Sequence, residues 1–162
     1  MTRRITTVFA ATLALALGSG VVWAQTAPGS SNEAVMWGGN EVTYTPQGLI
    51  LNGNAEVLQG ENRLRASRLE LIGQGGAASR VEASGDVYFV TPNETIRGDR
   101  AVYDMNADTV TVTGDVILTQ GQNVATGGRL VYNVGTGAAR LEGAQTPAGR
   151  RVQGVFYPNR SN

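Results

Sequence analysis

The stretch GDVYFVTPNETIRGDRAVY, residues 85–103, recurs twice more without a gap, as GNAEVLQGENRLRASRLEL at 53–71 and GDVILTQGQNVATGGRLVY at 114–132. Each copy opens with Gly-Asn or Gly-Asp, carries Asn or Glu at its tenth position and Arg at its sixteenth, and closes on Leu or Tyr. The copies start 32 and 29 residues apart. A repeat of about 30 residues is typical of stacked supersecondary units that bury one another.

Apolar residues alternate with wetter ones inside each copy, which predicts β-strands with one dry face. Further along each copy the apolar parity switches, and the switch coincides with Gly98-Asp99 and Gly127-Gly128. An extra residue is needed there, and glycine tolerates the backbone angles of a bulge or corner. The positions expected to face inward include Ala55, Val57, Leu64, Ala66, Leu69, Leu71, Val87, Phe89, Ile96, Gly98, Ala101, Tyr103, Val116, Leu118, Leu130 and Tyr132.

Turn signals punctuate the strands. The Gly-Asn and Gly-Asp pairs that open the copies predict tight hairpin turns, because Gly takes positive φ and the Asx side chain bonds local backbone. Residues 104–112 and 133–141 read as further hairpins, the second around Gly135-Thr136-Gly137. No stretch after residue 33 has helical periodicity. The sequence therefore predicts an all-β, repeat-built fold of about a dozen short strands.

The N-terminus has the features of an export signal. Arg3 and Arg4 precede an apolar stretch, and Val22-Trp23-Ala24 is a small-x-small cleavage site. We interpret residues 1–24 as a signal peptide cleaved after Ala24, residues 25–33 as a polar leader expected to be disordered, residues 34–158 as one domain and residues 159–162 as a polar tail. An uncleaved membrane anchor is the alternative, which the short stretch with its glycines disfavours.

The charged and reactive residues exclude most chemistry. Without Arg3 and Arg4 the chain has 11 Arg against 13 acidic residues, a net charge of −2, so nothing favours nucleic acid. It contains no Lys, His or Cys, which removes the usual bases for a Ser nucleophile, the transition-metal ligands and disulfides. No catalytic residue, metal or cofactor is therefore predicted. The run Asp104 to Asp108 resembles a calcium loop, but Thr109 stands where that loop requires Gly, so a hairpin loop is the preferred interpretation.

Two interiors are compatible with this pattern. With few aromatic residues and many small ones, the dry face can close into a modest core, or it can line a hollow trough for a long apolar guest. The residues alone leave both open.

The chain also resembles a known family. The opening Gly-Asp-Val, the run GDRAVYD at 98–104, TVTGDV at 111–116 and GGRLVYN at 127–133 are similar to the OstA-like family, whose type member is a periplasmic lipopolysaccharide (LPS) transport bridge protein. The similarity covers residues 35–157. The first copy departs most, with Leu71 for Tyr, Glu70 for Val and a connection three residues longer.

This resemblance implies a β-jellyroll, a V-shaped antiparallel slab whose apolar groove shelters the acyl chains of LPS. It implies partners in the inner-membrane and outer-membrane LPS-transport components with similar jellyroll domains, and a periplasmic location. The residues expected to line the groove are Val57, Leu64, Leu69, Val87, Phe89, Ile96, Tyr103, Val116, Leu118, Leu130 and Tyr132.

Arginines and sheet edges supply two further candidate sites. Arg68, Arg100 and Arg129 are equivalent in the repeat, so we expect a column on one flank that either meets lipid A phosphates or pairs with acidic side chains. The first and last strands are expected to be open edges that add strands of partners, giving a head-to-tail homo-oligomer. The edge residues are Glu41, Val42, Thr43, Tyr44, Val152, Val155, Phe156 and Tyr157.

Two other functions fit the same sequence less well. One is a membrane-anchored jellyroll subunit of the same transport machine. The other is a carbohydrate-active enzyme or structural surface protein built from repeats. An enzyme of this kind needs two converging carboxylates, and the repeat places most acidic residues at turns or on the wet face.

Overall fold

The computed structural model describes residues 33–74, 77–144 and 151–158. The predicted signal peptide, all but Glu33 of the leader and the tail lie outside these ranges. The described residues form ten strands and no helix, so no helix there is long and apolar enough to cross a membrane. The strands are β1 Val35–Gly38, β2 Glu41–Thr45, β3 Gly48–Gln59, β4 Asn62–Gln74, β5 Ala77–Val90, β6 Thr95–Asp104, β7 Thr109–Gln120, β8 Asn123–Asn133, β9 Ala139–Glu142 and β10 Gln153–Val155.

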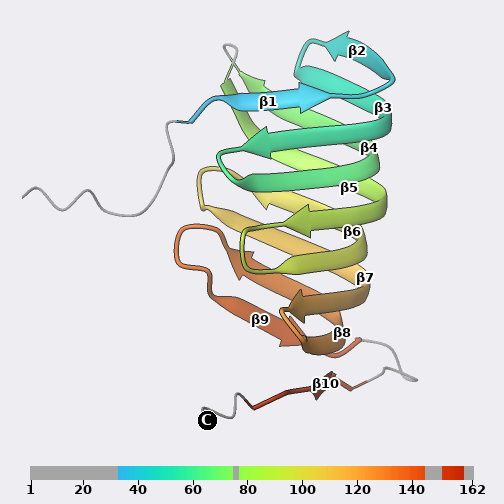
Figure 1. Cartoon of the computed structure of the whole chain (residues 1–162). Helices are drawn as coiled ribbons and strands as arrows, with labels where there is room; N and C mark the ends of the chain where they lie inside the picture. The colour runs from blue at the N-terminus through green and yellow to red at the C-terminus, as the bar shows by residue number, and fades with distance from the viewer. Residues whose placement is uncertain (1–32, 75–76, 145–150, 159–162) are drawn as a thin grey trace, which may run out of the picture.

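All ten strands belong to one antiparallel sheet. Its order is β1-β3-β4-β5-β6-β7-β8-β10, with β2 also paired to β3 and β9 also paired to β8. Consecutive long strands are therefore neighbours, and they stack down the molecule as successive rungs (Figure 1). The strands β3 to β8 run for 10 to 14 residues. They are longer and fewer than the dozen short strands expected, because each continues through a corner.

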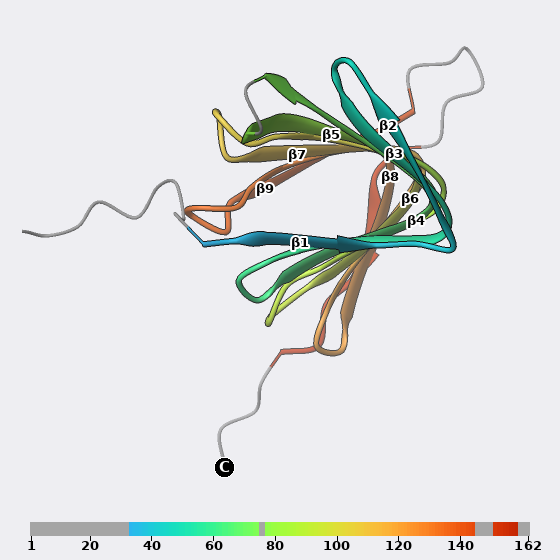
Figure 2. The same ribbon diagram turned by 90° about the horizontal axis from the view of Figure 1, so that it is seen from above.

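The corner divides the sheet into two wings, which meet along one side and diverge toward the other (Figure 2). β3 pairs with β2 through residues 48–52 and with β1 through residues 56–59. One wing, called the β2 wing, comprises β2, β9 and the strand residues 48–52, 68–74, 77–84, 100–104, 109–113 and 129–133. The β1 wing comprises β1, β10 and the strand residues 55–59, 62–66, 87–90, 95–98, 116–120 and 123–127.

The Gly-Asx pairs make this corner, so their prediction as hairpin turns was wrong. Gly114 and Asp115 have φ of 80° and 36°, and the two preceding copies have the same left-handed pair. Yet β7 continues through it, and its pairing with β8 skips from Thr113 to Val116. A hairpin turn and a mid-strand corner both require positive φ, so the local signal is the same. The predicted bulge at Gly98-Asp99 is confirmed, since the β6–β7 register shifts between Arg97 and Arg100.

The corner glycines are constrained by space as well as by φ. A Cβ on Gly114 would lie 2.8 Å from the Cβ of Asp99, whereas a Cβ on Gly121, also at positive φ, would meet nothing within 4 Å. We expect Gly114→Ala to lower the free energy of unfolding by about 2–4 kcal/mol and Gly121→Ala by about 1 kcal/mol, measured by urea unfolding. Equal losses would show that Asp99 moves aside without cost.

The interior is a single apolar cluster to which both wings contribute. Phe89 of the β1 wing contacts Tyr132 of the β2 wing edge to face, with ring centroids 5.6 Å apart. The residues predicted to face inward are buried or, for Leu118, packed against the cluster, which confirms the alternation. The predicted hairpins at 104–112 and 133–141 are confirmed as the β6–β7 and β8–β9 connections.

Candidate lipid-binding groove and strand edges

The predicted groove lining lies between the two wings. Ten of its eleven residues are no more than 5% exposed, and Leu118 is half-buried. The lining is therefore continuous from rung to rung but filled by its own side chains. An acyl chain reaches most of these residues only when the two wings separate. The acyl-chain role of these eleven residues stays a prediction.

The same face contains residues that the repeat alignment missed. They lie in the connecting halves of strands, outside the 19-residue copies, where the same alternation would have found them. These buried residues are Leu51, Val81, Ala83, Val110 and Val112.

Polar side chains close the side of the V that lies opposite the corner. The Tyr103 hydroxyl donates to Gln59 Oε1 at 2.9 Å, and the Tyr132 hydroxyl donates to Glu94 Oε2 at 2.8 Å. Both bonds run from the β2 wing to the β1 wing or its loop. Thr91 Oγ1 and Gln120 Nε2 also donate to the Glu94 carboxylate, each at 3.2 Å. Sequence reasoning named the two tyrosines only as groove lining and missed Gln59, Thr91, Glu94 and Gln120, although the seventh and tenth positions of every copy are polar.

The environment of the two tyrosines keeps them neutral. Burial, followed by the nearby Asp108 carboxylate, raises the pKa of Tyr103 above its ordinary value of 10.0. Burial, followed by the hydrogen bond to Glu94, raises the pKa of Tyr132 in the same direction, against a smaller lowering by Thr91. Both hydroxyls therefore remain hydrogen-bond donors throughout the physiological range.

The predicted arginine column exists, and it lies on the outer face of the β2 wing. Arg68 and Arg100 both pair with Ser84, and Arg100 and Arg129 both pair with Thr113, so the three lie in one row across the sheet. Arg68 Nη2 lies 3.6 Å from Glu70 Oε2, and Arg129 Nη1 lies 3.5 Å from Glu142 Oε2. These exposed pairs contribute little stability each. A phosphate role stays a prediction, and it requires the lipid headgroup to reach the outside of the wing.

The run from Asp104 forms a turn in the structure. The Asp104 carboxylate accepts hydrogen bonds from the backbone N–H groups of Asn106 at 3.0 Å and Ala107 at 3.1 Å. Among the described residues, no group of three acidic side chains is arranged to hold a metal ion.

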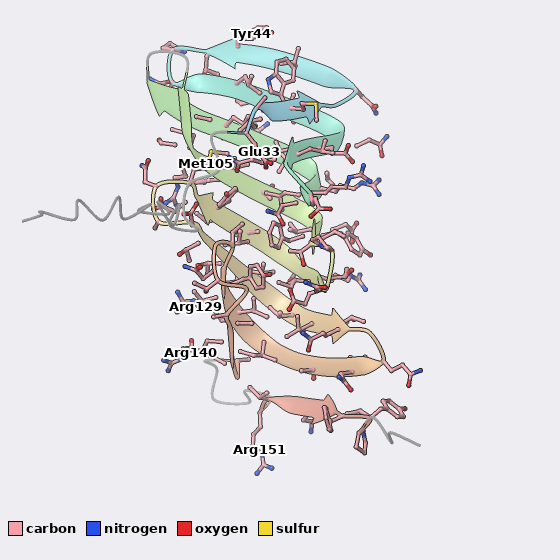
Figure 3. The ribbon with its side chains drawn as sticks, turned by 60° about the vertical axis from the view of Figure 1, so that its left-hand side comes forward. Glu33, Tyr44, Met105, Arg129, Arg140 and Arg151 are labelled. Atoms are coloured by element: carbon pink, nitrogen blue, oxygen red, sulfur yellow. The ribbon has the colours of Figure 1, made fainter. Side chains whose placement is uncertain are left out.

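The two ends of the stack are open edges with exposed apolar side chains. Tyr44 lies at one end and Arg151 at the other (Figure 3). At the first end Trp37 and Tyr44 are 40% and 71% exposed, and their rings meet edge to face at 6.4 Å. At the other end Val152, Val155, Phe156 and Tyr157 are exposed. The predicted edge strands are thus in place, but β1, at the same end as β2, was missed.

A hollow of about 880 Å³ lies at the corner near the C-terminal end. Its lining includes Arg97, Asp99, Asp115 and Arg151 around glycine backbone. Because charged side chains of both signs line it, it does not suit an acyl chain.

Comparison with known proteins gives a consistent result. A sequence profile of the family described as "LptA/(LptD N-terminal domain) LPS transport protein" matches residues 39–138. An uncharacterized protein of Rhizobium meliloti (strain 1021) is 28% identical over an alignment 114 residues long, which covers 64% of this chain and 59% of that protein. The LPS-assembly protein LptD of Neisseria gonorrhoeae (strain ATCC 700825 / FA 1090) is 35% identical over an alignment 109 residues long, which covers 64% of this chain and 13% of that protein. The chain thus spans less than two thirds of each relative.

A solved structure shares the fold. LptH of Pseudomonas aeruginosa, described as the LptA-homologous periplasmic component of the conserved lipopolysaccharide transport device, matches with a TM-score of 0.68 at 18% identity. The match covers 78% of this chain and 96% of that one. It confirms the predicted jellyroll.

Proposed function

Because the chain belongs to the LptA and LptD N-terminal-domain family of LPS transport proteins, we propose that it shelters LPS acyl chains between its wings and carries LPS across the periplasm. In this role it is exported, its signal peptide is cleaved after Ala24, and it works in a bridge from the inner to the outer membrane. No catalytic step is needed.

The observation that carries the proposal is the unbroken apolar face shared by both wings. Transfer of one methylene from water to an apolar surface is favourable by about 0.8 kcal/mol, so a lipid with several acyl chains needs a dry path over its whole journey. The inward residues recur on every rung, from Leu51 near one end to Leu130 near the other. Near-equivalent rungs allow the chains to slide with small changes in free energy.

Partner contacts are assigned to the two ends. β2 pairs only with β3 and β10 only with β8, so each has an edge available for strand addition. The exposed apolar side chains at both ends suit contacts with the inner-membrane and outer-membrane components, and with further copies of the chain. The Arg column faces outward, and Arg100, which makes no ion pair among the described residues, is its best candidate for a lipid A phosphate.

Trp37 offers a direct test of lipid in the groove. In a chain that starts at Gln25 it is the only tryptophan, and it pairs with inward Val57 at the open end of the β1 wing. We expect lipid A with brominated acyl chains to quench Trp37 fluorescence on binding, because bromine quenches at contact distance.

The matched control moves the probe to the outer face. In the Trp37→Phe, Tyr88→Trp variant the tryptophan takes the place of an exposed residue next to buried Phe89. It should be quenched much less by the same lipid. Equal quenching of the two probes would contradict binding between the wings.

A further inference from the structure

Two hydrogen bonds fasten the wings together at the side opposite the corner. On the β2 wing, Tyr103 and Tyr132 are the last residues but one of β6 and β8. On the β1 wing, Gln59 is the last residue of β3 and Glu94 immediately precedes β6. The bonds are Tyr103 to Gln59 at 2.9 Å and Tyr132 to Glu94 at 2.8 Å. Figure 2 shows that the wings are joined by continuous strands on the corner side only. We call these four residues the clasp.

Glu94, one of the two acceptors of the clasp, is held in place independently of Tyr132. Thr91 and Gln120 both donate to the Glu94 carboxylate, and Thr91 Oγ1 accepts the backbone N–H of Glu94 at 3.1 Å. Glu94 therefore keeps two donors if Tyr132 leaves. Breaking this bond does not abandon a buried charge, which is the costly event in most polar interiors. The bond between Tyr132 and Glu94 can therefore open without leaving the carboxylate unpartnered.

The filled interior makes such an opening necessary. Phe89 and Tyr132 contact each other across the wings, so an acyl chain entering from the side must separate these residues. The same movement withdraws the Tyr132 hydroxyl from Glu94, since ring and hydroxyl belong to one side chain. Loading from the side and opening of the clasp are thus one event.

We propose that the clasp controls entry of LPS acyl chains from the side: it holds the wings closed without lipid and opens as the chains enter. Once released, the tyrosine hydroxyls are donors at the boundary between the dry interior and water, where they meet the ester and amide carbonyls at the base of the acyl chains. The first copy has Leu71 where the others have tyrosine, so the clasp belongs to the second and third rungs. This inference rests on the proposed function.

The test uses spin labels on the two sides of the opening. The chain has no cysteine, so Asn93→Cys in the β5–β6 loop and Asn106→Cys in the β6–β7 loop, both exposed, are labelled uniquely. Electron–electron double resonance then measures the distance between the wings. Purified LPS should add a longer-distance population to the otherwise unchanged chain.

Removal of both hydroxyls should produce the same change without lipid. Each lost hydrogen bond shifts an opening equilibrium about five-fold, so Tyr103→Phe, Tyr132→Phe should enlarge the open population about 25-fold and accelerate LPS loading. Tyr88→Phe, which removes an exposed hydroxyl from the outer face, is the matched control and should change neither. A cleavable crosslink between the two thiols of the Asn93→Cys, Asn106→Cys variant should block loading until it is cut.

The outcomes separate the two proposals. If no variant binds LPS, the proposed function fails. If LPS binds while the distances in the double variant and in the lipid-bound chain match those of the free chain, the clasp proposal is overturned and the transport proposal stands. Urea unfolding of each variant establishes that it is folded under the conditions of the measurement.

Discussion

Replacing Phe89 with alanine will lower the free energy of unfolding by about 3–5 kcal/mol, the largest stability effect expected of a single substitution. Phe89 is 1% exposed and fully enclosed between the wings. Its loss removes the transfer free energy of the ring, leaves a cavity that the stacked rungs cannot easily close, and deletes the edge-to-face contact with Tyr132. Urea unfolding measures the change.

The neighbouring residue is the control. Tyr88 is an aromatic residue of the same strand that points outward, is 38% exposed and lies under Arg97. Tyr88→Ala should cost about 1 kcal/mol or less. If Phe89→Ala lowers the free energy of unfolding as little as Tyr88→Ala does, the interior is a hollow trough, because truncating a side chain beside empty space leaves no new cavity.

The second large effect is on self-association. Deleting residues 151–162 removes β10 and the exposed Val152, Val155, Phe156 and Tyr157. For a chain that starts at Gln25, we expect the sedimentation coefficient to increase with protein concentration. The deletion should weaken this self-association by at least about 100-fold, or about 3 kcal/mol. Because deletion uncovers the β8 edge, Val155→Asp, Phe156→Asp provides a variant that keeps the strand. Tyr88→Asp on the outer face should leave association unchanged.

Mixing experiments distinguish a head-to-tail contact from a symmetric dimer. A chain blocked at one end by Trp37→Asp, Tyr44→Asp retains its C-terminal end, and the Val155→Asp, Phe156→Asp chain retains the other. A heterologous contact predicts that the two variants, each monomeric alone, form a 1:1 complex that grows no further. If either variant alone forms oligomers that become larger with concentration, end-to-end contact is contradicted.

Much of the fold can be predicted from the repeat. Alternation at residues such as Val57 and Val116 assigns the inward face, because a pleated strand has a period of two whatever its neighbours. The parity switch near Gly98 requires an extra residue, which the structure places in the corner. The Gly-Asp pairs were misread because left-handed φ is a local property, whereas a turn and a corner differ only in where the strand pairs next. β1 was missed because its four residues show no alternation long enough to detect.

The site is less predictable than the fold. The clasp joins residues from different rungs and opposite wings, and no periodicity of a single strand encodes the separation of Tyr132 from Glu94. The choice between a core and a trough also depends on that separation. The structure has the wings in contact through Phe89 and Tyr132, so a groove for lipid requires movement that the sequence pattern does not specify.

The most direct test of lipid between the wings is photo-crosslinking in cells that make LPS. A photoreactive residue is placed at inward Phe89 or Leu118, or at outward Glu56 or Ile117. We expect LPS adducts from the two inward positions and few from the two outward ones, since acyl chains reach Phe89 only between the wings. Equal labelling from both faces would contradict the proposed groove.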